Sequence, residues 1–312
     1  MASQRDVKNR ISSIKNIQKI TRAMEMVAAA RLRRAEQRIA ALRPYAEAIR
    51  RMTHQAAAAA GAEAASFALL REHEHVNEVG LLLITGDRGL AGGFNSQIIR
   101  AGVRAGGELS EEGRNPVWYA TGRRGVSSLN FRGRELSGSY TGFADRPAYA
   151  DARGIADDLM TAYIDGRLQR VEILYNSYVS PLTQEVPRET LLPLSQALLE
   201  DAGEEGPAGG GDRADAVGED RAPRAPRALV EYEPGPEELL KRLVPDYVEI
   251  SIYRALIESA AGFFGAQMTA MRNASENAGT LIEDYTLQMN RARQAEITQE
   301  IMEVVAGAEG LS

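Results

Sequence analysis

The stretch that decides the fold is residues 14–49, IKNIQKITRAMEMVAAARLRRAEQRIAALRPYAEAI. Its apolar and small residues recur at spacings of three and four, which is typical of a helix that buries one stripe against another helix. The stripe consists of Ile14, Ile17, Thr21, Met24, Ala28, Leu32, Ala35, Ile39, Leu42, Ala46 and Ile49. Met24, Ala28 and Leu32 follow one another at intervals of four, and this departure from the heptad predicts a local unwinding of the coiled coil.

This stripe belongs to a helix that is longer than a globular domain needs. From Ser3 to Ala60 the chain holds no glycine and one proline, Pro44, and a helix of that length spans roughly 80 Å at 1.5 Å per residue. The other end of the chain resembles it. After Pro245, a residue type favoured at the first helical position, no proline follows, and the pattern predicts roughly 90 Å of helix.

The second stripe is thinner than the first, because Ala and Gln dominate its lower part. It consists of Ile250, Tyr253, Ile257, Ala260, Phe264, Met271, Ala274, Ala278, Leu281, Tyr285, Gln288, Ala292, Ala295, Gln299 and Met302. An apolar stripe on an isolated helix is not stable in water. We therefore predict that the two terminal helices cover each other as an antiparallel coiled coil. Pairing of each stripe with another subunit, or burial as an ordinary core helix, is the alternative.

The middle of the chain predicts a small Rossmann-like α/β domain with a mostly parallel sheet. Glu78–Thr85 is a continuous apolar strand that is followed by a glycine-rich turn and a helix from about Asn95. Further strands are expected at residues 116–120, 135–140, 171–179 and 184–192, and a further helix at 148–165. Alternating strands and helices favour parallel pairing, whereas the short connection before the last strand makes it antiparallel.

The domain organisation follows from these patterns. We expect an N-terminal coiled-coil helix (1–65), an α/β domain (76–199), a disordered loop (200–228) and a C-terminal coiled-coil helix (229–312). The loop holds 6 Gly, 3 Pro and 7 Ala, with 8 acidic against 4 basic residues, a composition that cannot bury enough apolar surface to fold. We interpret it as an inert linker in preference to an acidic brake on a partner surface.

Composition and charge exclude several classes of function. The chain has no Cys and three His, which excludes disulfides, thiolate metal sites and cysteine nucleophiles. Its longest strongly apolar run, residues 81–84, is far shorter than a membrane span of ~20 residues, so we expect a soluble intracellular protein that is at most peripheral to a membrane. The net charge of −6 conceals a basic segment, residues 1–51, with 13 Lys and Arg against 4 Asp and Glu. A basic segment on an acidic chain predicts a polyanionic partner: nucleic acid, anionic lipid or an acidic protein surface.

The motifs that could carry chemistry are weak. The glycine-rich turn spaces its glycines as Gly86, Gly89, Gly92 and Gly93, which matches neither a dinucleotide fingerprint nor a P-loop with its Lys-Ser or Lys-Thr. A tight strand-to-helix turn is therefore favoured over a nucleotide site. His73-Glu74-His75 has no third ligand, and no catalytic constellation stands out. We predict no catalytic, cofactor-binding or metal-binding residues.

Four motifs carry a resemblance to a known family. They are residues 20–34 (ITRAMEMVAAARLRR), 85–95 (TGDRGLAGGFN), 232–240 (YEPGPEELL) and 290–308 (NRARQAEITQEIMEVVAGA). In these motifs the chain closely resembles the gamma subunits of bacterial F-type ATP synthases, and the resemblance covers nearly the whole chain except residues 200–228. It implies a rotary motor: the coiled coil is the central shaft, and it turns inside a ring of three alpha and three beta subunits.

The resemblance also implies the partners and the location. The α/β domain would sit against the epsilon subunit and the ring of c subunits, and proton transport would turn that ring and the shaft with it. ATP synthesis would take place in beta, so the chain itself would be a non-catalytic rotor subunit with no cofactor, no small-molecule substrate and no nucleic-acid partner. It would lie on the cytoplasmic side of the bacterial plasma membrane as a peripheral membrane protein.

The resemblance finally implies contact residues. Those toward alpha and beta are Met24, Asp87, Arg88, Arg293, Gln294 and Thr298, and those toward the c ring and epsilon are Tyr232 and Glu233. Many bacterial relatives carry Cys where Ala91 stands, and the thiol switch of chloroplast relatives is impossible in a chain without Cys. Two alternatives stay open: a coiled-coil scaffold that binds nucleic acid or anionic surfaces through its basic N-terminal helix, and a nucleotide-dependent enzyme that uses the glycine-rich turn.

Overall fold

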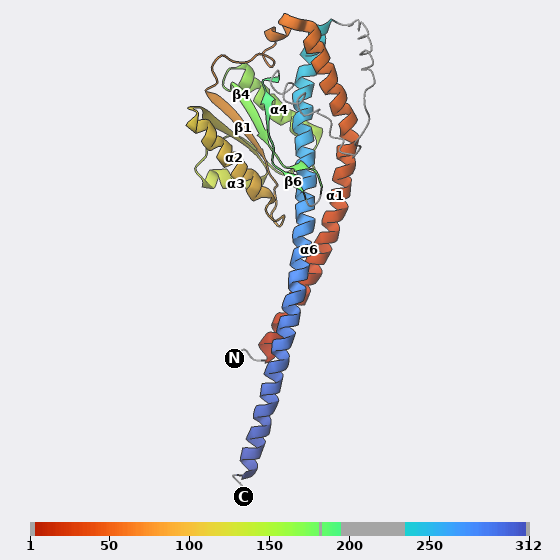
Figure 1. The fold of residues 1–312 in the computed structure, drawn as a ribbon, viewed down its shortest axis with the longest axis vertical. Helices are drawn as coiled ribbons and strands as arrows, with labels where there is room; N and C mark the ends of the chain where they lie inside the picture. Colours follow the sequence, from red (N-terminus) through yellow and green to blue (C-terminus); the bar gives the residue numbers. More distant parts are fainter. Residues whose placement is uncertain (1–3, 181–182, 195–234, 310–312) are drawn as a thin grey trace, which may run out of the picture.

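The structure is a computed structural model, and it describes residues 4–180, 183–194 and 235–309. It consists of a long two-helix rod and an α/β head that lies against the upper part of the rod (Figure 1). Helices α1 (Gln4–Ala60) and α6 (Pro236–Glu309) form the rod and run antiparallel, and the short 3-10 helix η1 (Gly61–Ser66) follows α1. The predicted fold class is confirmed. None of the described helices is long and apolar enough to cross a membrane.

Helix α6 begins earlier than the sequence analysis predicts. Its first residue is Pro236, and Pro245 lies inside the helix, so the predicted start at Pro245 is wrong. The observed start suits a helix better, because Pro236 occupies the first position and Glu237 and Glu238 place negative charge in the first turn. The interior proline is tolerated because its neighbours Val244 and Val248 are buried in the core.

The stripe that α1 buries keeps heptad spacing from Val7 to Ala60, and Met24, which the prediction placed in it, is half-buried like Glu25. The predicted local unwinding near Met24 stays a prediction. Its buried and half-buried members are Val7, Ile11, Ile14, Gln18, Thr21, Glu25, Ala28, Leu32, Ala35, Ile39, Leu42, Ala46, Ile49, Thr53, Ala56 and Ala60. Gln18 takes the place predicted for Ile17, which is 53% exposed. Polar pairing with α6 therefore outweighs hydrophobicity at this position.

The stripe of α6 differs from the prediction in its lower part. Below Met271 the covered heptad positions are Ser275, Ala278, Ile282, Tyr285, Met289 and Ala292, and the predicted Ala274 is half-buried beside them. Leu281 and Met302 were expected in the stripe, but they are 45% and 64% exposed, and Gln288, Ala295 and Gln299 are also exposed. The covered residues keep the heptad in step with α1 and end at Ala292.

The head contains a five-stranded sheet with the order β3-β2-β1-β4-β7. The strands are β1 (Glu78–Ile84), β2 (Asn115–Thr121), β3 (Leu136–Tyr140), β4 (Arg170–Leu174) and β7 (Arg188–Leu192). All neighbouring pairs are parallel except β4 and β7, which are antiparallel, as the sequence predicts. The predicted strand 171–179 is interrupted after Leu174, and 184–192 is interrupted by Pro187, which lacks the N–H that a ladder needs. The outer pieces form a separate ribbon of β5 (Ser177–Tyr178) and β6 (Gln184–Glu185).

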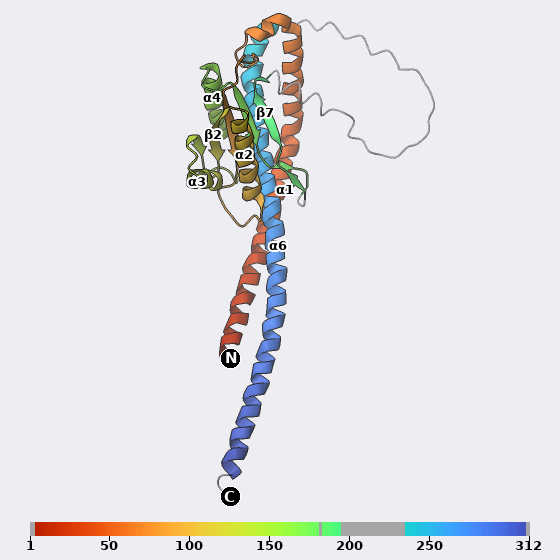
Figure 2. The ribbon, with the colours of Figure 1, turned by 60° about the vertical axis from the view of Figure 1, so that its left-hand side comes forward.

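The sheet is covered on both faces. Val79, Leu81 and Leu83 of β1 pack into the cluster that includes α2 (Phe94–Glu111) and α3 (Arg123–Phe131). Leu82 and Ile84 pack into the cluster of α4 (Tyr149–Ile164) and upper α6. Figure 2 shows the same arrangement after rotation, with the rod passing along the sheet. Head and rod therefore share their hydrophobic core.

Candidate interaction sites on the rod and at its junction with the head

The glycine-rich turn between β1 and α2 is held by its own polar groups. The Asn95 side-chain oxygen accepts the Gly86 N–H at 2.8 Å, and its amide nitrogen donates to the Arg88 carbonyl at 3.1 Å. Leu90 adopts a φ of 63° although it is not a glycine, and its side chain is 64% exposed. Such a conformation costs of order 1–3 kcal/mol, and the surrounding structure has to hold it.

Asp87 fastens the turn to two other parts of the head. Its carboxylate accepts the N–H groups of Arg123 at 3.0 Å, Gly142 at 3.1 Å and Ala144 at 3.1 Å. The carboxylate thus ties the turn to the start of α3 and to the loop 141–148. Because a negative charge occupies the turn and satisfies nearby amides, the geometry favours the strand-to-helix turn over a phosphate cradle.

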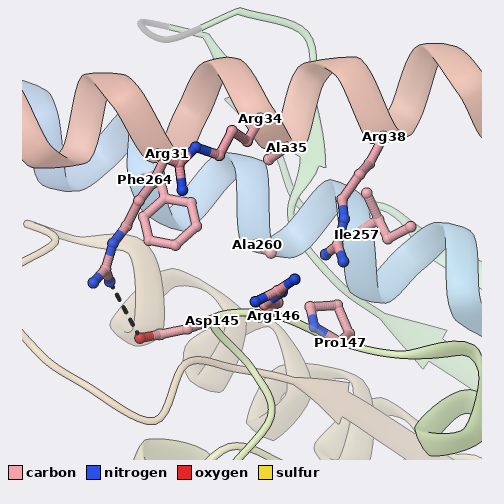
Figure 3. Close-up of a pocket in the computed structure, with 10 residues that line it drawn as sticks. All are labelled: Arg31, Arg34, Ala35, Arg38, Asp145, Arg146, Pro147, Ile257, Ala260 and Phe264. Atoms are coloured by element: carbon pink, nitrogen blue, oxygen red, sulfur yellow. Dashed lines mark ion pairs between the residues drawn. The ribbon is translucent and has the colours of Figure 1, made fainter.

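Arg88, which directly follows Asp87, points to the junction of head and rod. Its guanidinium lies 3.5 Å from the Asp145 carboxylate, and Arg31 of α1 approaches the same oxygen to 3.6 Å (Figure 3). The Arg88 side chain is 66% exposed, so this pair contributes little to stability. It does bring the glycine-rich turn, the loop 141–148 and the rod to one place.

Met24 lies on lower α1 beside polar contacts that the sequence analysis missed. The Thr21 and Ser275 hydroxyls are 2.7 Å apart, Gln18 donates to the Ser275 carbonyl at 3.1 Å, and Arg272 donates to Glu25 at 3.0 Å. Met24 itself is half-buried. A strict heptad count from Val7 would have found these positions, because it places Gln18, Thr21 and Glu25 in the stripe.

Arg293, Gln294 and Thr298 lie on the end of α6 that extends past α1. The pairs Gln18–Ser275 and Glu25–Arg272 fix the antiparallel register, and by that register Gln4, the first described residue of α1, lies opposite about residue 292. Arg293, Gln294 and Thr298 are exposed. Figures 1 and 2 show that the head lies beside the upper part of the rod, whereas the C-terminal end of α6, on which these three residues lie, extends far beyond it.

The same part of the rod exposes large apolar side chains. The exposed residues on lower α1 are Ile17, Ile20, Met26 and Val27, and those on lower α6 are Leu281, Leu287, Ile297, Ile301, Met302 and Val304. Upper α1 and α6 expose only Tyr45 and Met52 among the described large hydrophobic residues. An apolar surface of this extent marks an interaction site.

Two predicted contacts cannot be placed. Tyr232 and Glu233 lie outside the described residues, as does the segment 200–228. Within the part of the chain that the structure describes, no group of three or more His, Cys, Asp or Glu side chains could hold a metal ion.

Comparison with known proteins places these features in a family. A family model described as ATP synthase matches residues 3–311. The ATP synthase gamma chain of Moorella thermoacetica is 41% identical over 311 residues and covers 100% of both chains. That of a Parafrankia species is 40% identical over 317 residues, which is 100% of this chain and 99% of the relative.

Solved structures agree with the architecture. A chain from the central stalk and c ring of the Tetrahymena thermophila mitochondrial ATP synthase superposes with a TM-score of 0.57 and 25% identity, over 82% of this chain and 99% of that chain. A chain of the Euglena gracilis mitochondrial ATP synthase superposes with a TM-score of 0.64 over 99% of this chain and 94% of that chain. Its identity of 15% makes it evidence of the fold alone.

Proposed function

The chain belongs to the family of ATP synthase gamma chains, and we propose that it works as the central rotor shaft of a proton-translocating F-type ATP synthase. The observation that carries this proposal is the similarity to gamma chains along the full length, at about 40% identity. The geometry agrees with it: a long rod is attached to a head at one end and leaves its other end uncovered.

The exposed apolar surface of the rod is evidence for partner subunits that surround it like a sleeve. Ile301 is 57% exposed and Val304 is 73% exposed on the extension of α6, and apolar surface of this kind is stabilised when a partner removes it from water. We assign this sleeve to the ring of three alpha and three beta subunits. Met24, Arg88, Arg293, Gln294 and Thr298 are its candidate contacts, and the basic residues of segment 1–51 suit acidic loops of beta.

The head is the candidate contact of the c ring and the epsilon subunit, together with Tyr232 and Glu233 in the segment that precedes α6. Asp87 belongs instead with the candidate contacts of alpha and beta, to which it contributes through the shape of the turn that it holds. Torque applied to the head reaches the rod through their shared core, in which Leu32 of α1 and Phe263 of α6 pack with residues of the sheet. The Arg31–Asp145 ion pair lies across the same junction.

The shaft acts on its partners through differential contact. A partner changes the equilibrium of a binding site only when it interacts differently with the states of that site. A rod with the head on one side and unequal outer faces presents a different surface to each beta subunit. On this proposal the chain catalyses nothing itself, beta makes the ATP, and the complex is peripheral to the cytoplasmic face of the plasma membrane.

The alternative of a nucleic-acid-binding scaffold finds no support in the comparisons. Affinity purification of the tagged chain from membranes in mild detergent separates the two functions. If the chain is the rotor, we expect alpha, beta, epsilon and c subunits to co-purify with it in constant proportion at high salt. Recovery of the chain with DNA or RNA, lost as salt rises and without these subunits, would contradict the proposal.

A further inference from the structure

A cleft lies between α1 of the rod and the loop that joins β3 to α4. Its volume is about 390 Å³, and Figure 3 shows side chains from the rod and from the loop around one opening. The lining residues are Arg31, Arg34, Ala35, Arg38, Asp145, Arg146, Pro147, Ile257, Ala260 and Phe264. Three elements, each more than one hundred residues from the next in the sequence, thus build one site: α1, the loop 141–148 and α6.

The charges around the cleft do not balance. Four of its lining residues are arginines, and Asp145 is the one acidic residue among them. Asp145 is already engaged, because its carboxylate pairs with Arg31 at 3.6 Å and with Arg88 at 3.5 Å. Within the described ranges, Arg34, Arg38 and Arg146 form no ion pair. Three guanidinium groups therefore line the cavity without an ion pair. They lie beside one carboxylate, Asp145, whose Oδ2 pairs with Arg31 and Arg88 and whose buried Oδ1 accepts no hydrogen bond within the described residues.

Hydrogen bonds within the head fix the loop that forms one side of the cleft. The Arg146 N–H donates to the Phe143 carbonyl at 2.9 Å, and Pro147 follows directly in the chain. The Asp87 carboxylate holds the N–H of Ala144 in the same loop at 3.1 Å. These two hydrogen bonds fix the backbone of the loop, so that Arg146 starts from a defined position beside the cleft.

The chemistry of the cleft selects its ligand. Guanidinium groups donate paired hydrogen bonds that match phosphate oxygens. A single phosphate monoester carries about −1.5 to −2 charges at pH 7, which is less than three arginines can neutralise. Two linked phosphates match them better. Ile257, Ala260 and Phe264 add an apolar floor beside the arginines, suited to the organic part of a ligand.

We propose that the cleft between α1 and the loop 141–148 binds a pyrophosphate group, either free or at the end of a nucleoside diphosphate. The site involves Arg34, Arg38 and Arg146 as phosphate ligands and the apolar floor as the support of a nucleoside. None of its lining residues belongs to the glycine-rich turn, although Arg88 of that turn pairs with Asp145 at its edge. The site does not depend on the proposed rotor function. A ligand there would join the head to the rod at the junction that Arg31 and Asp145 already bridge.

The test is calorimetric titration of the purified full-length chain with inorganic pyrophosphate and, separately, with ADP, both without magnesium and at constant ionic strength. We expect both probes to bind. Each of Arg34→Gln, Arg38→Gln and Arg146→Gln should weaken binding by about tenfold or more, equivalent to at least ~1.4 kcal/mol, because each removes a charged hydrogen-bond donor to phosphate. Arg33→Gln is the matched control on the same helix, because Arg33 is exposed and does not line the cleft, and it should change nothing.

A second variant keeps the test independent of folding. Asp145→Asn releases Arg31 and Arg88, so it should tighten pyrophosphate binding by about two- to fivefold, in keeping with the modest strength of exposed charge pairs. A damaged protein would not bind more tightly. Tighter binding of ADP than of pyrophosphate identifies the nucleotide as the ligand, and equal binding identifies the pyrophosphate group alone.

Two results would overturn the proposal. The first is that neither pyrophosphate nor ADP binds. If a short poly-glutamate peptide binds at the cleft instead, the cleft is an interface for an acidic protein. The second is binding that the three Arg→Gln variants and Arg33→Gln weaken equally, which would make it a general effect of the basic helix.

Discussion

The upper part of the rod, which lies against the head, and the lower part, which extends beyond the head, are stabilised in different ways. In the upper part, residues such as Ile49 and Ala56 of α1 and Val248 of α6 share one apolar core with the head. In the lower part, the contact between the helices is polar around Thr21 and Ser275, and large apolar residues such as Val27 and Leu287 face outward, 52% and 54% exposed. The upper rod thus has its stabilising partners within the chain, and the lower rod presents its apolar surface to other chains.

The polar contacts in the lower part of the rod set the register in which the two helices pair. Apolar residues at every heptad position would let the helices slip by one heptad or bind other helices. The Gln18, Thr21 and Glu25 contacts are satisfied in one register only. Polar contacts therefore give this section a defined alignment, and the apolar residues outside remain available for partners.

The largest effect should come from a change in the head that breaks its internal packing. Gly122 has a φ of 80°, and a Cβ there would lie 2.2 Å from the Thr85 carbonyl oxygen. We expect Gly122→Ala to lower the free energy of unfolding by roughly 3–5 kcal/mol, measured by urea denaturation followed by circular dichroism.

Gly133→Ala is the matched control. Gly133 also has a positive φ, 69°, but a Cβ added there would meet no atom within 4 Å. The control substitution should cost only about 1 kcal/mol. Equal losses for the two variants would show that backbone conformation alone, without the close approach to Thr85, sets the stability of the head.

The next effect concerns function without stability. Arg88→Glu reverses an exposed charge that faces Asp145, so the free energy of unfolding should change by less than ~1 kcal/mol. In the assembled complex we expect ATP-driven proton pumping to fall by about tenfold, equivalent to ~1.4 kcal/mol. Arg132→Glu, on the outer end of α3, is the control. Unchanged ATP hydrolysis and proton pumping in Arg88→Glu would contradict an electrostatic contact between Arg88 and the beta subunit.

A double-mutant cycle tests the polar section of the rod. Thr21→Val alone leaves the Ser275 hydroxyl without this partner, so it should cost about 1 kcal/mol. Ser275→Ala alone should cost less, because the Thr21 hydroxyl still donates to the Gln18 carbonyl at 3.0 Å. The double variant should cost less than the sum, because no hydroxyl of the pair is then left unsatisfied. Strictly additive losses in thermal or urea unfolding would mean that the two hydroxyls do not interact.

The smallest effect is a dependence of stability on pH. Burial at the junction raises the pKa of Glu258, whose carboxylate accepts a hydrogen bond from Ser177 at 3.1 Å. Because the folded-state pKa lies above the unfolded value, protonated Glu258 favours the folded state at low pH, and this contribution is lost as the pH rises through the folded-state pKa. Glu258→Gln should therefore be slightly more stable than the parent at pH 7 and should show a flatter pH profile. A steeper profile in the variant would contradict this assignment.

The sequence predicts the fold well because the faces that pair over long range are visible in local patterns: the heptads of the two long helices and the apolar run of strand 78–85. The errors arise where tertiary contacts override local hydrophobicity. Ile17 looks more suited to a buried stripe than Gln18, but only Gln18 finds a hydrogen-bond acceptor on α6. The cleft near Arg146 could not be predicted, because nothing local relates the loop 141–148 to α1. The contact residues came from family resemblance, and all of them remain predictions.

The central claim is that the whole chain turns as a shaft within a complex, and its lack of Cys allows a direct measurement. Arg132→Cys creates a single labelling site on the exposed end of α3, to which a bead can be attached in a complex immobilised through its beta subunits. We expect the bead to rotate in one direction when ATP is added and to stop when ATP is removed. A bead that stays fixed while the same complexes hydrolyse ATP would contradict the account.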